Sequence, residues 1–276
     1  MARPFAPVEV PPVSEQRGET FVRLVELMQR LLAPDGCPWD REQSPDSLKR
    51  YVMEEACEVV DAIESGDRAH LREELGDLLL QIVFLAELAR KEGQFGSDDV
   101  VRSIVEKLVR RHPHVFGDVG VSDSEEVLRN WERIKAAERR DRALLHGVPR
   151  SLPALARAQR IGEKVQRVGF DWPDARGSRA KLTEELREMD QVMAGSDRRK
   201  VEEEVGDVLF ALVNLARHLG VDAEAALRRT TDKFEKRFAH VETKVIEKHG
   251  QWPDGGSASL PLEELDGYWE EAKRRE

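Results

Sequence analysis

Two stretches of the chain repeat one spacing of acidic residues: Glu-Glu-x-x-Glu, then Glu-x-x-Asp, with sixteen residues from the last Glu of the first group to the Glu that opens the second. Residues three apart in a helix lie on one face, so each group presents two carboxylates side by side. In the first stretch a turn signal, Ser65-Gly66-Asp67, separates the groups, and two antiparallel helices would bring them together. The predicted carboxylate sets are Glu55, Glu58, Glu74 and Asp77 in the first stretch and Glu185, Glu188, Glu204 and Asp207 in the second.

These carboxylates predict a metal site. On a helical wheel Glu74 and Asp77 fall inside the apolar arc that contains Phe84 and Leu85, where like charges repel one another and lose hydration. A divalent cation is the simplest compensation, and an all-oxygen ligand set favours Mg²⁺, with Mn²⁺ as the second possibility. Solvated surface glutamates are the alternative, which the repetition disfavours. A di-iron bundle would need Glu-x-x-His pairs, and no histidine of the sequence has a Glu three residues before it.

Basic and aromatic residues also recur in both halves. Lysine and arginine four residues apart suit phosphate oxygens, which arginine can bind through two nitrogens. A tryptophan four residues before a lysine offers an aromatic face for a base and a cation for a phosphate. The candidates are Lys107, Arg111, Trp131 and Lys135 in the first half and Lys233, Arg237, Trp269 and Lys273 in the second. The alternative, a solvated basic face beside a packed tryptophan, stays open.

The carboxylates belong to an internal repeat. Residues 54–86 and 184–216 align without a gap at an offset of 130, and 13 of the 33 positions are identical. Strand-forming residues are scarce and helix-forming Ala, Leu, Glu and Arg abound, which predicts an all-α fold. We expect a disordered, proline-rich leader over 1–18, a first helical-bundle repeat over 19–145, a linker over 146–158 and a second repeat over 159–276.

The overall charge limits the partners. The 276 residues carry 54 acidic and 44 basic side chains, a net charge of −10. That balance argues against a nucleic-acid partner, because proteins that bind nucleic acids usually have a basic surface. It still allows a phosphate-bearing ligand that is held through a metal. The two cysteines cannot build a disulfide framework. The sequence has no signal-peptide pattern and no apolar run of about 18 residues, so we expect a cytoplasmic protein with no membrane partner.

Several further segments accompany the acidic patterns: Cys-Pro-Trp-Asp at 37–40, Gly-Phe-Asp-Trp at 169–172, and the segments 107–116, 233–238 and 269–273. With these the chain resembles the MazG family of nucleoside triphosphate pyrophosphohydrolases, within the all-α NTP pyrophosphatase superfamily. The resemblance implies tandem MazG-like helical-bundle repeats, usually assembled as a homodimer. It also implies Mg²⁺-dependent hydrolysis of ribo- or deoxynucleoside triphosphates to the monophosphate and pyrophosphate. By match to the family motif, the catalytic metal ligands would be Glu185, Glu188, Glu204 and Asp207, and the nucleotide would contact Lys233, Arg237, Trp269 and Lys273.

We therefore expect an enzyme that cleans the nucleotide pool. A metal-bound water would attack the α-phosphorus, Lys and Arg would neutralise the leaving pyrophosphate, and Glu184 or Glu203 is a candidate to orient the water. Two alternatives remain: a narrow pyrophosphohydrolase acting on dUTP, dCTP or phosphoribosyl-ATP, and a non-enzymatic helical binding or regulatory module with a structural metal. The first half keeps every counterpart residue, so the sequence gives no reason to exclude a second active site.

Overall fold

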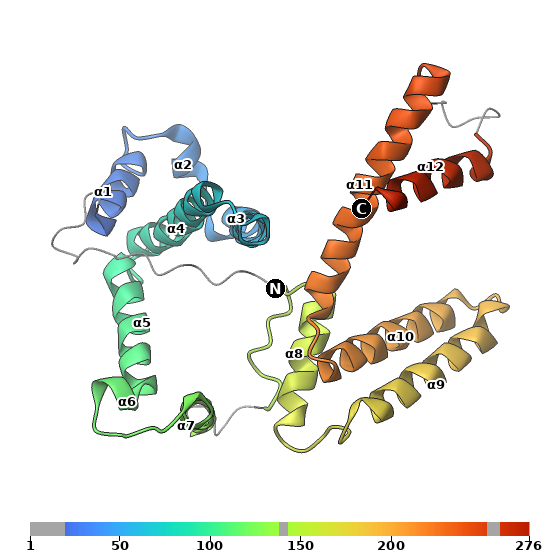
Figure 1. Ribbon diagram of the computed structural model, residues 1–276. Helices are drawn as coiled ribbons and strands as arrows, with labels where there is room; N and C mark the ends of the chain where they lie inside the picture. Colours follow the sequence, from blue (N-terminus) through green and yellow to red (C-terminus); the bar gives the residue numbers. More distant parts are fainter. Residues whose placement is uncertain (1–19, 138–142, 253–259, 276) are drawn as a thin grey trace. The chain divides into compact units, whose positions relative to one another are not determined.

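The computed structural model describes residues 20–137, 143–252 and 260–275, and every regular element in this part of the chain is a helix (Figure 1). The prediction of an all-α fold is confirmed. The chain divides into two compact units, Met1–Arg140 and Asp141–Glu276. The leader expected over 1–18 lies outside the described residues. None of the described helices combines the length and the apolar character needed to cross a membrane.

The first unit contains α1 to α7: α1 (Phe21–Leu31), α2 (Pro38–Glu42), α3 (Pro45–Ser65), α4 (Arg68–Lys91), α5 (Ser97–Arg111), α6 (Pro113–Phe116) and α7 (Ser124–Ala137). Helices α3 and α4 form an antiparallel hairpin. Gly66 turns the chain with a φ of 74°, and the Asp67 carboxylate caps α4 by accepting from the backbone N–H groups of Ala69 and His70. A core of Met28, Leu32, Leu48, Val83, Phe84 and Leu88 holds α1 against this hairpin.

The second unit contains α8 (Ala154–Gln166), α9 (Ala175–Met193), α10 (Arg198–His218), α11 (Ala223–His249) and α12 (Leu262–Arg274). Helices α9 and α10 form the second hairpin, and Asp197 caps α10 as Asp67 caps α4. Helix α8 lies against α10, and α12 lies against α11 (Figure 1). The capping aspartates occupy equivalent positions of the repeat, so the sequence duplication corresponds to a duplicated hairpin.

The segment expected to be a linker, 146–158, lies within the second unit, and α8 begins inside it at Ala154. The buried side chain of Lys164 explains how the preceding residues are held. Its Nζ donates to the carbonyl oxygens of Leu144, at 3.2 Å, and His146, at 2.7 Å. The segment that precedes α8 is thereby fastened to that helix.

Both hairpins leave the same apolar stripe in solvent. In α4 the side chains of Leu75, Leu79 and Ile82 are 38–50% exposed, and at an offset of 130 residues Val205, Leu209 and Leu212 of α10 are 41–49% exposed. Residues with these spacings share one face of a helix. A repeated apolar face of this kind marks a surface that is suited to a protein partner.

Candidate metal and nucleotide site

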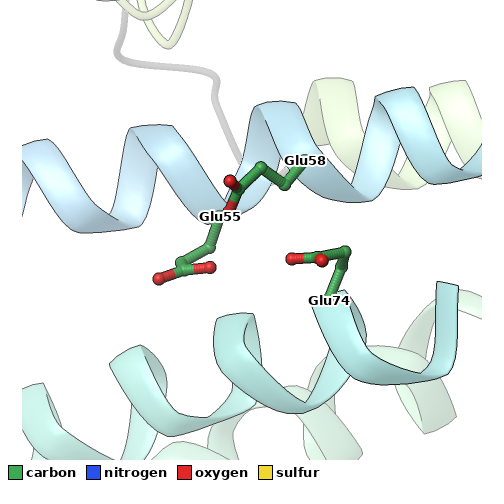
Figure 2. Close-up of side chains that lie close together, drawn as sticks. All are labelled: Glu55, Glu58 and Glu74. Carbon is green, nitrogen blue, oxygen red and sulfur yellow. The ribbon is translucent and has the colours of Figure 1, made fainter. Parts of the chain in front are cut away.

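Each hairpin brings three carboxylates together. In the first hairpin, carboxylate oxygens of Glu55 and Glu58 on α3 and of Glu74 on α4 lie within 4.8 Å of one another. Figure 2 shows Glu55 and Glu74 reaching into the space between the two helices, with Glu58 beside Glu55. We call these residues the first triad. The second hairpin forms the second triad, Glu185, Glu188 and Glu204, with the same spread of oxygens.

The fourth predicted carboxylate of each set lies outside its triad. Asp77 acts on the first triad through its charge, which raises the pKa of Glu55. Asp207 lines a cavity together with Glu185 of the second triad. The hairpins therefore gather three of the four predicted carboxylates in each half and place the fourth beside them.

The triads carry electrostatic strain that a cation would relieve. Burial, the hydrogen bond with Glu58 and the charges of Asp77, Glu58 and Glu74 raise the pKa of Glu55. In the second triad, burial and then the charge of Glu185 raise the pKa of Glu188. Glu74 and Glu185 are 8% and 6% exposed, so they also lose most of their hydration. An all-oxygen set of this kind suits Mg²⁺ or Mn²⁺.

The basic neighbours of the two triads differ. Lys181 places its Nζ 2.7 Å from Glu185 Oε1 and 2.8 Å from Glu184 Oε1, and these hydrogen bonds raise the pKa of the lysine. Tyr51 occupies the equivalent position in the first hairpin. The first triad instead has His70, whose Nε2 lies 2.9 Å from Glu74 Oε1. Sequence reasoning missed Lys181, although its spacing of three and four residues from Glu184 and Glu185 was a sufficient signal.

A cavity of about 350 Å³ adjoins the second triad. Lys181, Glu185 and Asp207 contribute polar groups to its wall, and Phe170, Trp172 and Phe210 contribute aromatic rings. The combination of an apolar wall with a few convergent polar groups is typical of small-molecule sites.

The equivalent positions of the first hairpin hold larger or buried side chains. Phe84, which is 3% exposed, stands where the second hairpin has the cavity-lining Asn214, and Gln81, 8% exposed, stands where it has Ala211. Phe84 belongs to the hydrophobic core that α1 completes, and Tyr51 packs against that core. The two triads are therefore set in different surroundings.

Asp171 lies at a buried polar cluster in the wall of this cavity. Its Oδ1 accepts from Arg217 at 2.6 Å and from the backbone N–H of Trp172 at 3.0 Å, and it lies 3.0 Å from His218 Nε2. Its Oδ2 is buried and has no hydrogen-bond partner among the described residues. Burial by itself would raise the pKa of Asp171, but the hydrogen bonds and charges of Arg217 and His218 outweigh it and lower that pKa. The aspartate is therefore an ionised acceptor. The sequence offered Asp171 only as part of the Gly-Phe-Asp-Trp segment, with no role attached.

The predicted nucleotide-binding residues of the second half lie on α11 and α12. The Arg237 guanidinium lies 5.6 Å from the centroid of the Trp269 ring, and the ring of Phe234 lies 4.9 Å from the same centroid. Lys233 is exposed, and Lys273 Nζ lies 2.5 Å from Glu270 Oε1. Figure 1 shows α12 beside α11, apart from the α9–α10 hairpin that carries the second triad. Arg237 and Trp269 therefore form a group with Phe234 on these two helices.

Their counterparts in the first half lie on α5 and α7. Lys107 lines a cavity of about 440 Å³ with Phe95 and Asp99, and Arg111 is the last residue of α5. Lys135 is 7% exposed and places its Nζ 3.9 Å from the centroid of the Trp131 ring. The cation therefore sits on the aromatic face that the spacing had offered to a base.

Known proteins match nearly the whole chain. The family model described as the MazG nucleotide pyrophosphohydrolase domain matches residues 43–116 and again 176–242. A protein of Thermotoga maritima named nucleoside triphosphate pyrophosphohydrolase/pyrophosphatase MazG is 45% identical over 262 residues, which cover 94% of this chain and 98% of the relative. The nucleoside triphosphate pyrophosphohydrolase of Escherichia coli K12 is 47% identical over 263 residues, covering 92% and 97%. The crystal structure of a MazG-related protein from Thermotoga maritima matches 41% of this chain and 97% of its own, at 31% identity and a TM-score of 0.37.

Proposed function

The chain belongs to the MazG family, and we propose that it hydrolyses nucleoside triphosphates to the monophosphate and pyrophosphate at the second triad. The relatives' names supply the reaction class. One observation supports the second triad as the site of hydrolysis. Glu185 and Asp207 line a cavity together with Phe170 and Trp172, so a carboxylate cluster adjoins an aromatic wall. The relatives do not favour the alternative of a non-enzymatic module.

We propose that Glu185, Glu188 and Glu204 hold Mg²⁺, or Mn²⁺ in its place. The donor set fits such an ion, because oxygens of the three carboxylates lie within 4.8 Å of one another, and burial and then like charge raise the pKa of Glu188. Asp207 is the candidate for a further ligand from the cavity side. When bound, the ion would neutralise charge on the phosphate oxygens and acidify a water for attack on the α-phosphorus.

The chain's own residues would orient the substrate. Lys181 lines the cavity beside Glu185, so its ammonium group can face a phosphate oxygen once the triad is neutralised. The apolar wall would exclude water from the nucleoside end. Glu184 on α9 and Glu203 on α10 are exposed, and they remain candidates to orient the attacking water.

A homodimer would complete the site. Lys233, Arg237, Trp269 and Lys273 are the proposed nucleotide contacts, yet they lie on α11 and α12, apart from the hairpin of their own unit (Figure 1). A second copy could bring its α11 and α12 to the triad. The exposed stripe of Val205, Leu209 and Leu212 on α10 supports such a contact, because apolar faces of this kind are buried between subunits.

The decisive experiment is a nucleotide panel with product analysis. Purified protein is incubated with Mg²⁺ and each of the common ribo- and deoxynucleoside triphosphates, and pyrophosphate and phosphate are measured separately. The proposal predicts pyrophosphate and a nucleoside monophosphate in equal amounts, and no turnover in excess chelator. Release of phosphate and a diphosphate, or no turnover with any nucleotide, would contradict it. Broad turnover would support a role in cleaning the nucleotide pool, whereas a single accepted base would support a narrow pyrophosphohydrolase.

A further inference from the structure

The cavity beside the second triad extends along α10. Asp207 and Arg217 both line it and are ten residues apart on one helix, which corresponds to about 15 Å along the axis. Asp207 lies at the end with Glu185, and Arg217 holds Asp171 at the other end. That length suits a nucleotide whose α-phosphate lies at the triad and whose base lies near Asp171.

The base end of this cavity offers an acceptor that no described residue uses. The Asp171 side chain is 9% exposed, and Arg217, His218 and the backbone N–H of Trp172 all bind its Oδ1, while no residue in the described ranges bonds its Oδ2. A buried acceptor without a hydrogen bond is unfavourable, and such a group calls for an explanation. Asn214 and Arg217, which also line the cavity, bind each other, since Arg217 Nε donates to Asn214 Oδ1 at 2.9 Å. Asp171 Oδ2 is therefore available to a donor from a ligand.

We propose that Asp171 Oδ2 reads the nucleobase by accepting a hydrogen bond from an N–H group on its Watson–Crick edge. This inference rests on the proposed function. The base ring would lie among Phe170, Trp172 and Phe210, which line the same cavity. Phe170 precedes Asp171 in the chain and is 79% exposed, so little packing holds its ring and it can move as the base enters, while Trp172 stays packed against Gly177.

The chemistry defines what the site accepts and rejects. An ionised carboxylate only accepts hydrogen bonds, so the ligand must donate. Adenine and cytosine offer amino groups, guanine offers an amino group and a ring N–H, and uracil and thymine offer a ring N–H. All common bases can therefore satisfy Asp171. A base with no N–H on that edge leaves the carboxylate without a partner, and sites built around such a group discriminate strongly against the analogue that lacks it.

Purine riboside 5′-triphosphate provides the test, because it differs from ATP only by the missing 6-amino group. The kcat/KM for pyrophosphate release is measured for both nucleotides with the wild-type protein and with Asp171→Asn. We expect the wild type to favour ATP by about tenfold or more, mainly through KM. In Asp171→Asn the amide oxygen can keep the bond with Arg217, while the NH₂ group takes the place of Oδ2 and donates instead of accepting. The preference for ATP should then fall to about twofold or less.

Controls separate the possible failures. Asp40→Asn makes the same chemical change in the Cys-Pro-Trp-Asp segment of the first unit and should keep the wild-type ratio. Equal kcat/KM values for the two nucleotides in the wild type would overturn the inference while leaving the hydrolase activity in place. A variant Asp171→Asn that is slower with both nucleotides but keeps the ratio would make Asp171 a structural residue and would also overturn it. If the variant does not fold, as judged by circular dichroism, the wild-type ratio decides alone. No pyrophosphate from any nucleotide would instead be a failure of the proposed function.

Discussion

The indole of Trp172 lies against the backbone of Gly177, where a Cβ atom would come within 2.2 Å of Trp172 Cδ1. No side chain larger than hydrogen fits between α9 and this ring. Gly177 therefore fixes one wall of the cavity beside the second triad, although it contributes no functional group.

Gly177→Ala tests this contact. We expect the added methyl group to displace Trp172, to raise the KM for nucleoside triphosphates several-fold and to cost about 1–3 kcal/mol of unfolding free energy through overpacking. Steady-state kinetics and denaturant unfolding measure both effects. Gly76→Ala is the matched control, since a Cβ at Gly76 meets no atom of the described residues within 4 Å and an alanine inside α4 should be neutral or slightly stabilising. An unchanged KM in Gly177→Ala would show that Trp172 does not shape the substrate site.

Glu204→Gln and Glu74→Gln make the same change in the two triads. Glu204→Gln removes a charged ligand beside the cavity, and pyrophosphate release should fall by more than about 100-fold, because changes in the partners of metal ligands alone cost 10–100-fold. Glu74→Gln should leave most activity, because Phe84 and Gln81 occupy the positions that line the cavity in the other half. Pyrophosphate release at saturating Mg²⁺ measures both. Equal losses in the two variants would contradict the assignment of hydrolysis to the second triad.

Lys181→Met separates substrate binding from metal binding. Without the ammonium group, the KM for nucleoside triphosphates should rise about tenfold or more, since a charge-assisted contact is lost. The rise in melting temperature produced by Mg²⁺ should persist or increase, because Lys181 no longer competes for Glu185. Lys200→Met, which removes an exposed lysine four residues before Glu204, serves as the control. Loss of the Mg²⁺ effect in Lys181→Met alone would show that the lysine organises the metal site itself.

Glu264 gives a prediction about pH. Its Oε1 lies 2.8 Å from His249 Nε2, 2.9 Å from the Tyr268 hydroxyl and 3.0 Å from Lys248 Nζ, and these hydrogen bonds lower its pKa from 4.5 to about 2. A pKa that is lower in the folded state stabilises the fold above the unfolded value, and this contribution is lost as the pH falls from about 4.5 towards 2.

Glu264→Gln should therefore lower the melting temperature at pH 7, and the difference from the wild type should shrink as the pH falls below about 4.5. Thermal unfolding followed by circular dichroism over this range measures it. Glu263→Gln, an exposed neighbour on the first turn of α12, should show little difference at any pH. A constant difference between wild type and Glu264→Gln down to the lowest pH would contradict the assigned interactions.

Spacing along the chain was enough to predict the hairpins and all three carboxylates of each triad, although Asp77 and Asp207, which were predicted with them, lie outside the triads. The pairs Glu55/Glu58 and Glu185/Glu188 follow from helical periodicity, and an aspartate that caps a helix marks where each second helix begins. The spacing of the pairs and the caps are local features. The hairpin depends only on two neighbouring helices, which a short turn places side by side. For the same reason the all-helical class and the duplicated unit could be predicted without coordinates.

Features that depend on side-chain packing between distant segments could not be predicted from the sequence. The spacing of Trp131 and Lys135 was compatible with a base and phosphate site or with a packed tryptophan, and only the structure shows that the lysine is buried against the ring. The repeat predicted the same metal-binding role for both acidic patterns, but Phe84 stands where the second hairpin has Asn214, and this difference changes the surroundings of the first triad. The Oδ1 atom of Asp171 is held by Arg217, 46 residues away along the chain, while no described residue bonds its Oδ2. Such relationships arise only when distant segments come together, and no periodicity encodes them.

Because the hairpin is duplicated, one copy can be packed for stability while the other has a cavity for a ligand. A cavity is a gap in a core, and gaps destabilise a fold. In the first hairpin Phe84 fills the equivalent space and belongs to a core that α1 completes. In the second hairpin Ala211 and Asn214 line a cavity that has room for a ligand. Substitutions in the first hairpin are therefore expected mainly to change the lifetime of the folded protein, and those in the second mainly to change which ligands it binds.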